Sequence, residues 1–221
     1  MHKCEQFNTV SKFYLYLAKI VYMELVFATA NPHKLEEAQH ILSEYVQLVS
    51  PAHLGYTQDI PETGNTLEAN ALQKARCIWQ ALGRDCFADD TGLEIDALQG
   101  APGVYSARYA GPQANMQENI DKVLAELDKQ PLRTARFRCV IALIIQGKEY
   151  LFEGQIPGEM LHSREGSAGF GYDPIFRPTG YTKSFATMSA REKNTISHRA
   201  LALAKLRDFL QAIPCYTKRS S

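Results

Sequence analysis

Residues 24–34 read Glu-Leu-Val-Phe-Ala-Thr-Ala-Asn-Pro-His-Lys, and this stretch decides the fold class. The run at 25–29 is short and apolar, which favours a buried strand. Asn31 then supplies a helix N-cap, and Pro32 is favoured at the first helical position, so we expect a helix that ends near Leu42. A strand that leads directly into a helix is the first part of an alternating α/β pattern.

Strand and helix patterns continue to alternate along the rest of the chain. The further strands that the sequence predicts are 46–50 and the arms of a hairpin around Gln146-Gly147-Lys148, 136–145 and 149–155. The further helices that it predicts are 65–82, 113–127 and 197–211. We expect Asn65 to cap the first of these, with Glu68 reaching back, and Ser189 to form a capping box with Glu192. The fold class is therefore α/β.

The length of 221 residues fits one domain or two lobes of one domain. Met23 directly precedes the first strand, so we interpret 1–22 as an N-terminal extension outside the core, with Met23 as the natural start. Residues 23–214 then form a single two-lobed domain. The last residues, 215–221, are a polar tail.

Composition argues against several classes of protein. Lysine and arginine total 24, matched by 24 aspartates and glutamates, so no global field draws the chain to nucleic acid or to an anionic membrane. The apolar run at 13–22 contains Lys19 and is too short to span a bilayer. The five cysteines form no Cys-x-x-Cys pair, which argues against a disulfide framework and a zinc site. We therefore expect a cytoplasmic protein.

Two adjacent acids stand in the stretch Phe-Ala-Asp-Asp-Thr-Gly-Leu-Glu at 87–94. Neighbouring side chains of a strand point to opposite faces, so Asp89 and Asp90 cannot both have the same role. Paired acids at a strand end are typical of a divalent metal site or an activated water, but Asp-Asp-Thr-Gly is also an ordinary turn composition. We interpret 89–92 as a turn that presents one carboxylate to a ligand.

Two other segments place lysines where an anion could bind. In Thr29-Ala30-Asn31-Pro32-His33-Lys34 the strand aims a helix N-terminus and the Lys34 charge at whatever lies beyond it, although a capped helix with a solvent lysine fits equally. Glu62-Thr63-Gly64 precedes the helix that carries Lys74. This lysine lies at the edge of the apolar stripe, where it either snorkels to solvent or reaches into a cleft.

The segment Gly-Ser-Ala-Gly-Phe-Gly-Tyr-Asp-Pro at 166–174 is rich in glycine. Glycines flank Phe170, so its ring either lies against a flat ligand or belongs to the core. Asp173 precedes a proline, which predicts extended backbone there and a fixed direction for its carboxylate. Further on, His198 and Arg199 stand in the first turn of a predicted helix. Cationic side chains there oppose the helix dipole, which is mildly unfavourable, so we expect these residues to be present for some other purpose.

Taken together, these segments resemble the inosine triphosphate pyrophosphatase family. The matching pieces occur in the family's order over about residues 23–212, and they are Thr29-Ala30-Asn31-Pro32-His33-Lys34, Glu62-Thr63-Gly64, Asn70-Ala71 with Lys74-Ala75, Ala88-Asp89-Asp90-Thr91-Gly92-Leu93, Gly100-Ala101-Pro102-Gly103-Val104-Tyr105-Ser106-Ala107-Arg108, Gly169-Phe170-Gly171-Tyr172-Asp173-Pro174, and Lys193 with Ile196-Ser197-His198-Arg199. Two positions depart from the family pattern. Ala30 stands where glycine is common, which leaves less room beside a phosphate, and Thr91 stands where serine is common and keeps the hydroxyl.

The resemblance implies hydrolysis of ITP, dITP and XTP between the α and β phosphates, with Mg²⁺ as cofactor. It also implies an elongated central mixed β-sheet with flanking helices, two lobes around a nucleotide cleft, and a homodimer. Asp90 would be the catalytic base and would hold Mg²⁺ with Glu62, while Asp89 would support the site from the second layer. The residues that would contact the substrate are Thr29, Ala30, Asn31, Pro32, His33, Lys34, Lys74, Thr91, Phe170, Gly171, Tyr172, Asp173, Lys193, His198 and Arg199.

The same residues suggest how a purine base would be recognised, and two alternative functions remain open. Donors from Arg199 and His198 suit the 6-carbonyl of hypoxanthine and xanthine but not the amino group of adenine, and Phe170 would stack on the purine. One alternative is the septum-formation type of nucleotide pyrophosphatase, which lacks the Ser-His-Arg sequence found at 197–199. The other is a non-catalytic nucleotide- or RNA-binding protein, which has no need for acids beside a triphosphate.

Overall fold

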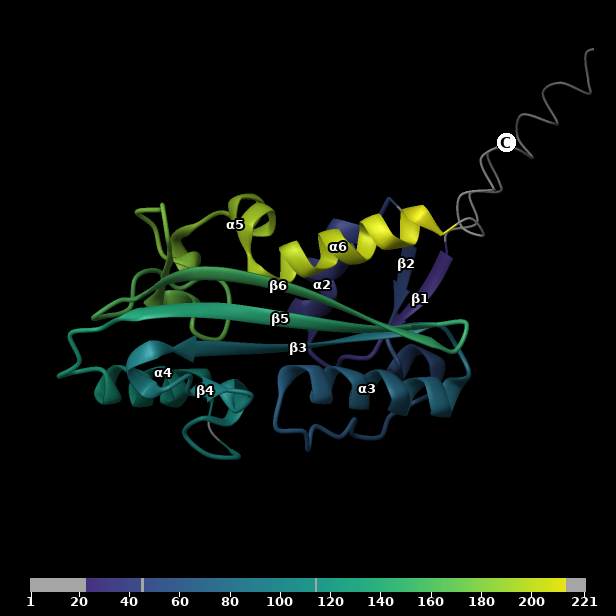
Figure 1. Ribbon diagram of the computed structural model, residues 1–221, viewed down its shortest axis with the longest axis horizontal. Helices are drawn as coiled ribbons and strands as arrows, with labels where there is room; N and C mark the ends of the chain where they lie inside the picture. The colour runs from purple at the N-terminus through teal and green to yellow at the C-terminus, as the bar shows by residue number, and fades with distance from the viewer. Residues whose placement is uncertain (1–22, 45, 114, 214–221) are drawn as a thin grey trace, which may run out of the picture.

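The structure is a computed structural model that describes residues 23–44, 46–113 and 115–213. The predicted extension at 1–22 and the predicted tail at 215–221 lie outside the described residues. The described part confirms an α/β fold built on one mixed sheet. Figure 1 shows this sheet with helices above and below it.

The sheet has seven strands, six of them in the order β2-β1-β3-β5-β6-β7, with β4 paired to β3. The strands are β1 (Met23–Phe27), β2 (Val46–Val49), β3 (Cys86–Ile95), β4 (Pro102–Gly103), β5 (Thr134–Ile145), β6 (Lys148–Met160) and β7 (Phe176–Pro178). Strand β1 runs parallel to β2 and β3, whereas the other pairs are antiparallel. The long β5–β6 hairpin extends along the whole sheet (Figure 1), and Gln146 and Gly147 both take positive φ at its turn, as a two-residue hairpin turn requires.

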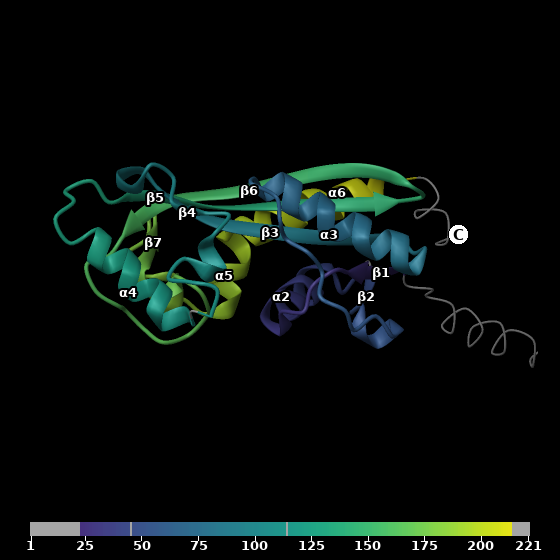
Figure 2. The same cartoon turned by 90° about the horizontal axis from the view of Figure 1, so that it is seen from below.

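Helices cover both faces of this sheet, as Figures 1 and 2 show. The helices are α2 (Pro32–Leu42), α3 (Leu67–Leu82), α4 (Met116–Glu126), α5 (Ala190–Ile196) and α6 (His198–Ala212). Helices α2 and α6 pack on one face over Phe87 and Ile141, while α3 packs on the other over Ala88 and Val140. Helix α4 packs toward the far end of the sheet with a third apolar cluster around Phe137.

Several local predictions are confirmed by the observed hydrogen bonds. Asn31 caps α2 by accepting from two backbone N–H groups, with Pro32 at the first helical position. Ser189 and Glu192 form the expected capping box at the start of α5. The hairpin lies where it was expected, with both arms longer than predicted. These features were predictable because each depends on residues only a few positions apart in the sequence.

The local predictions at 89–92 and at the start of α3 are wrong. Residues 89–92 are not a turn but the middle of β3, where every residue from Cys86 to Ile95 pairs with β5. The ladder satisfies the backbone there, so turn-forming side chains are tolerated. Helix α3 is capped by Thr66 rather than Asn65, because the Thr66 hydroxyl accepts from the backbone N–H of Ala69. Glu68 forms an ion pair with Arg138 on β5.

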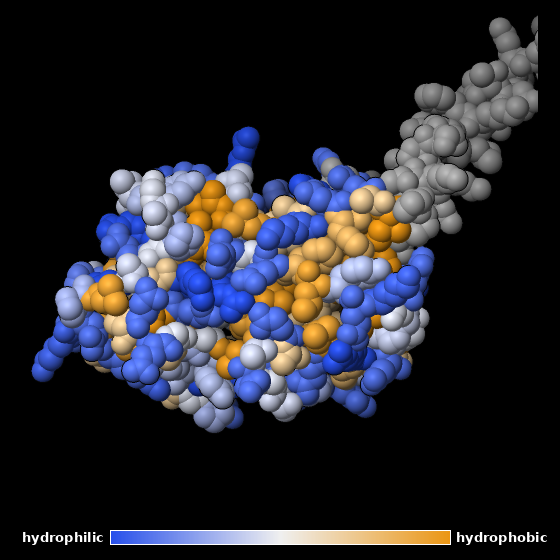
Figure 3. All heavy atoms as spheres, in the orientation of Figure 1, coloured by the Kyte–Doolittle hydropathy of each residue, from blue (hydrophilic) through white to orange (hydrophobic). Residues whose placement is uncertain are grey.

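Apolar side chains gather on the part of the surface seen in Figure 3, over the side of β6 and α6. Leu151 on β6 is 47% exposed and Leu201 on α6 is 37% exposed. Within the described ranges, no helix combines the length and the apolar character that crossing a membrane requires.

Candidate active site

The two adjacent acids of β3 lie on opposite faces of the sheet. Asp89 shares a face with Phe87 under α2 and α6. Asp90 shares a face with Ala88 over α3. Because the backbone stays extended, the alternation of the strand separates the two carboxylates into different environments. Asp89 and Asp90 therefore have different partners, which is consistent with the prediction that their roles differ.

Asp89 is a buried carboxylate held by two cations. Its oxygens accept from the Lys34 ammonium at 3.0 Å and from Nε of Arg199 at 3.1 Å, and the Thr91 hydroxyl donates to it at 3.3 Å. Burial alone would raise the pKa of Asp89, but the charges of Lys34 and Arg199 outweigh burial and hold the pKa below its ordinary value. Asp89 is therefore an anion that organises its neighbours.

Asp90 has a different environment on the α3 face. The Asn70 amide donates to it at 3.0 Å and the Lys74 ammonium lies 3.7 Å away. Burial raises the pKa of Asp90 above its ordinary value, against the opposing effect of Lys74. Asn70 also accepts from the backbone of Gly64 at 2.7 Å, so it fastens the segment that carries Glu62 beside Asp90.

Lys74 occupies the space between two carboxylates. Its ammonium forms ion pairs with Glu62 and Asp90, and its side chain is only 6% exposed. Burial would lower the pKa of Lys74, but the nearby acids raise it above its ordinary value. The lysine that the sequence placed at the edge of an apolar stripe therefore reaches into a cleft.

A second cluster of charges joins α2, α5 and α6. The Lys193 ammonium donates to Asp173 at 2.8 Å and to Glu37 at 3.1 Å. The other oxygen of Glu37 accepts from Arg199, and the charges of Arg199 and Lys193 hold the pKa of Glu37 below its ordinary value despite burial. The sequence analysis missed Glu37, because its partners Lys193 and Arg199 lie far away in the sequence.

Phe170 lies among cations and another ring. The ring of His33 is stacked on it, with centroids 5.6 Å apart, and Lys193 and Arg199 lie 4.8 and 5.3 Å from its centroid. The predicted extended conformation of Asp173 is wrong, because this residue begins a short 3-10 turn. The turn is fixed by the Asp173 carboxylate, which accepts from the backbone N–H of Phe170 at 2.8 Å.

His198 carries an unpaired polar atom. Its ring is stacked on Phe137 at 4.7 Å, and its Nδ1 is buried with no hydrogen-bond partner among the described residues. Burial holds the pKa of His198 well below its ordinary value, and the positive charge of Arg199 lowers it further. A buried polar atom without a partner is costly, which points to a ligand as the missing partner.

These side chains surround a cavity of about 580 Å³, a volume in the range of small-molecule sites. The predicted residues that line it are Thr29, Ala30, Asn31, Lys34, Glu62, Lys74, Asp90, Thr91, Phe170, Gly171, Tyr172, Asp173, Lys193 and His198. Pro32, His33 and Arg199 lie outside the lining; His33 touches the site through Phe170, and Arg199 through Asp89, Glu37 and Thr91. The loop after β2 also lines the cavity, through residues 56–60. The sequence analysis did not predict this contribution.

The donor set near Lys74 is compatible with a hard divalent cation. Glu62 and Asp90 converge on the same positive charge, the Lys74 ammonium. In the described ranges no group of three or more His, Cys, Asp or Glu side chains could hold a metal ion. Two carboxylates completed by water and phosphate oxygens are a usual arrangement for Mg²⁺, so the residues fit such an ion.

The buried His198 predicts a loss of stability on acidification. Its pKa is lower in the folded chain than the unfolded value of 6.5, so below pH 6.5 the unfolded chain binds a proton that the folded chain does not. The unfolding free energy should fall by about 1.4 kcal/mol per pH unit in that window. Urea unfolding between about pH 7.5 and pH 5.5 measures it. His198→Gln should flatten the dependence; equal slopes would contradict the assignment.

The fold and site together define a class of protein. An α/β fold whose cleft combines lysines, carboxylates and an aromatic ring is typical of enzymes that act on nucleotides. The chain belongs to the Ham1 family, whose model matches residues 25–209.

Curated relatives and solved structures agree with this membership. The chain is 54% identical over 188 residues to the dITP/XTP pyrophosphatase of Porphyromonas gingivalis, covering 85% of this chain and 97% of that protein. It is 47% identical over 197 residues to the dITP/XTP pyrophosphatase of Bacillus subtilis, covering 87% and 100%. The Ham1 protein structure from Coxiella burnetii matches with a TM-score of 0.81 at 39% identity, covering 86% of this chain and all of that one.

Proposed function

We propose that this protein hydrolyses the non-canonical purine nucleoside triphosphates ITP, dITP and XTP to the monophosphate and pyrophosphate. The observation that carries the proposal is the pair of unlike acids on β3. Asp90 faces the cavity with a raised pKa, while Asp89 is an anion fixed between two cations. A carboxylate whose pKa is raised by burial is suited to accept a proton near neutral pH.

In this mechanism Asp90 orients a water molecule and takes its proton as the water oxygen bonds to phosphorus. The α–β phosphoanhydride bond breaks in the same step, which releases the monophosphate and pyrophosphate. Lys34, Lys74 and Lys193 bind the phosphate oxygens, and Lys74 and Lys193 turn toward them from Glu62 and Asp173. Asp90 and Glu62 would hold Mg²⁺, which neutralises phosphate charge and polarises phosphorus. Asp89 keeps Lys34 and Arg199 in place.

Base selection is assigned to a separate set of side chains, namely His198, Phe170 and Arg199. The buried Nδ1 of His198 is free for the purine, and Phe170 supplies a stacking surface. Three of the Arg199 donors already serve Asp89, Glu37 and Thr91. Its remaining N–H groups are the ones available for the 6-carbonyl.

The testing experiment measures pyrophosphate release from ITP, XTP, GTP and ATP with and without Mg²⁺. We expect ITP and XTP to be turned over at least about 100-fold faster than ATP, because the amino group of adenine would leave buried donors unpaired. Excess chelator should abolish turnover. Equal rates on ATP and ITP would contradict base selection, undiminished activity in chelator would contradict the metal assignment, and binding without turnover would favour the non-catalytic alternative.

We also propose that the protein is a cytoplasmic homodimer. The family resemblance supports the dimer, and the free thiols of Cys77, Cys86 and Cys139 are compatible with a reducing compartment. Sedimentation equilibrium at micromolar concentration should give twice the mass of one chain. A mass equal to one chain would contradict the dimer.

A further inference from the structure

The segment from Gly103 to Arg108 was singled out in the sequence, but the site described above gives it no role. It follows β4 and contains a short 3-10 turn, Ser106–Arg108. Ser106 and Ala107 line the cavity. This segment therefore forms part of the cavity wall, and its last residue is a cation.

We propose that Arg108 is a further substrate-binding residue that takes the terminal phosphates of the nucleotide, and this rests on the proposed function. In the free protein its Nη1 lies 3.8 Å from Glu62. The other oxygen of Glu62 is paired with Lys74. Arg108 is therefore the next cation along the line of contacts that leads from Asp90 through Lys74 and Glu62 to the rim.

The backbone that carries Arg108 is firmly held. The Ser106 hydroxyl accepts from Leu93 N–H at 2.9 Å and donates to the Gly103 carbonyl at 2.6 Å. The Tyr172 hydroxyl donates to the Ser106 carbonyl at 2.8 Å, and Asn119 donates to Ala107 at 3.1 Å. This loop is thus a fixed support tied to the cleft and to α4.

Gly92 on β3 explains how the loop comes so close to the acids. A side chain there would meet the Gly103 carbonyl at 2.7 Å. Only glycine allows the loop to pack directly against the strand that carries Asp90.

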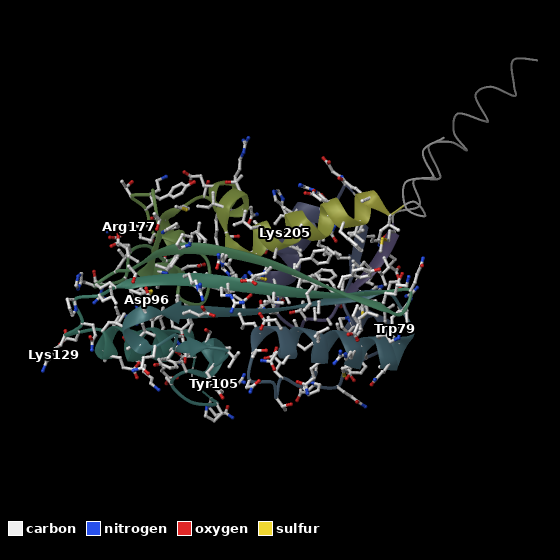
Figure 4. All side chains as sticks on the ribbon, viewed as in Figure 1. Trp79, Asp96, Tyr105, Lys129, Arg177 and Lys205 are labelled. Atoms are coloured by element: carbon white, nitrogen blue, oxygen red, sulfur yellow. The ribbon has the colours of Figure 1, made fainter. Side chains whose placement is uncertain are left out.

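The side chain of Arg108, in contrast, is lightly held. It is 33% exposed, and besides Glu62 its recorded contact is the face of Tyr105, at 5.5 Å. Tyr105 itself is 55% exposed and lies on the outer side of the loop, away from the sheet (Figure 4). A guanidinium on a fixed support, with one long ion pair, is free to turn from Glu62 to a better anion.

The balance of charge in the cleft favours movement of the Arg108 side chain toward a bound triphosphate. Four cations in the clusters described above face five carboxyl groups; they are Lys34, Lys74, Lys193 and Arg199 against Glu37, Glu62, Asp89, Asp90 and Asp173. The cleft therefore has no surplus positive charge to offer a triphosphate. Arg108 adds a positive charge beside Glu62.

The test compares binding of the two products to the full chain. Isothermal titration calorimetry with Mg²⁺ measures the Kd of inorganic pyrophosphate and of inosine monophosphate for the wild type and for Arg108→Gln. Loss of a charge-assisted contact should raise the Kd of pyrophosphate at least about tenfold. The Kd of the monophosphate should stay within about twofold, because the α-phosphate and base are held by other residues.

Arg164→Gln is the matched control, because Arg164 is also an ion-paired arginine, 35% exposed, and should leave both constants unchanged. Arg108→Lys keeps the charge but loses the planar fork, so its pyrophosphate affinity should be intermediate. Unchanged pyrophosphate affinity in Arg108→Gln, or equal weakening of both ligands, would overturn the proposal. The two proposals can fail separately. If the wild type releases pyrophosphate from ITP but Arg108→Gln binds pyrophosphate normally, the proposed function stands and only the role of Arg108 is excluded.

Discussion

Asp90→Asn is expected to lower kcat by about 10²–10⁴-fold, because the amide cannot accept the proton of the attacking water. The carboxylate lies in the cavity with Asn70 and Lys74 as neighbours, so the replacement keeps the shape of the site. Pyrophosphate release from ITP under saturating substrate measures the effect. Turnover at the wild-type rate would remove Asp90 from the mechanism.

The same variant should fold as well as the wild type. Burial raises the pKa of Asp90, which means that the ionised side chain is destabilised where it lies. A neutral isostere relieves that cost, and Lys74 keeps Glu62 as a partner. Urea unfolding at neutral pH should therefore give a free energy within about 1 kcal/mol of wild type. A large loss of stability would show that Asp90 has a structural role instead.

Asp89→Asn is expected to have the reverse effect on folding, with a loss of about 3–5 kcal/mol. Asp89 is 1% exposed and is the partner of both Lys34 and Arg199. Removing its charge leaves the buried guanidinium of Arg199 with Glu37 as its remaining carboxylate. The loss of one of the two carboxylates that pair with this buried cation accounts for the expected size of the destabilisation.

Urea unfolding of Asp89→Asn at neutral pH tests this expectation. Asp208→Asn is the control, since its carboxylate pairs with an arginine at the surface and is 65% exposed; it should change stability by less than about 0.5 kcal/mol. A stability near wild type for Asp89→Asn would mean that the charge of Asp89 is not needed to hold the two cations. The two neighbouring acids would then lose the distinction on which the mechanism depends.

Much of the fold could be predicted because its signals are local. The cap at Asn31, the capping box at Ser189 and the hairpin around Gln146-Gly147-Lys148 each depend on residues within a few positions of one another. The order of strands in the sheet could not be predicted in the same way. It depends on pairings such as Val26 with Cys86, which no local pattern records.

The residues of the site also differ in whether local sequence could predict them. Phe170, Lys74 and Asp90 were predicted from their sequence context, and all three line the cavity. Glu37 was missed because its importance comes from Lys193, 156 positions away in the sequence. The turn predicted at 89–92 was wrong because pairing with β5 overrides the preference of those side chains.

By itself, the sequence determined the α/β class, the helix caps and the chemistry available to the cleft, since residue type and short spacing carry that information. Tertiary structure alone decided which carboxylate meets which cation. Strand β3 turns Asp89 toward α2 and α6 and Asp90 toward α3. Those distant partners, acting through charge and burial, hold the pKa of Asp89 below its ordinary value and let burial raise the pKa of Asp90.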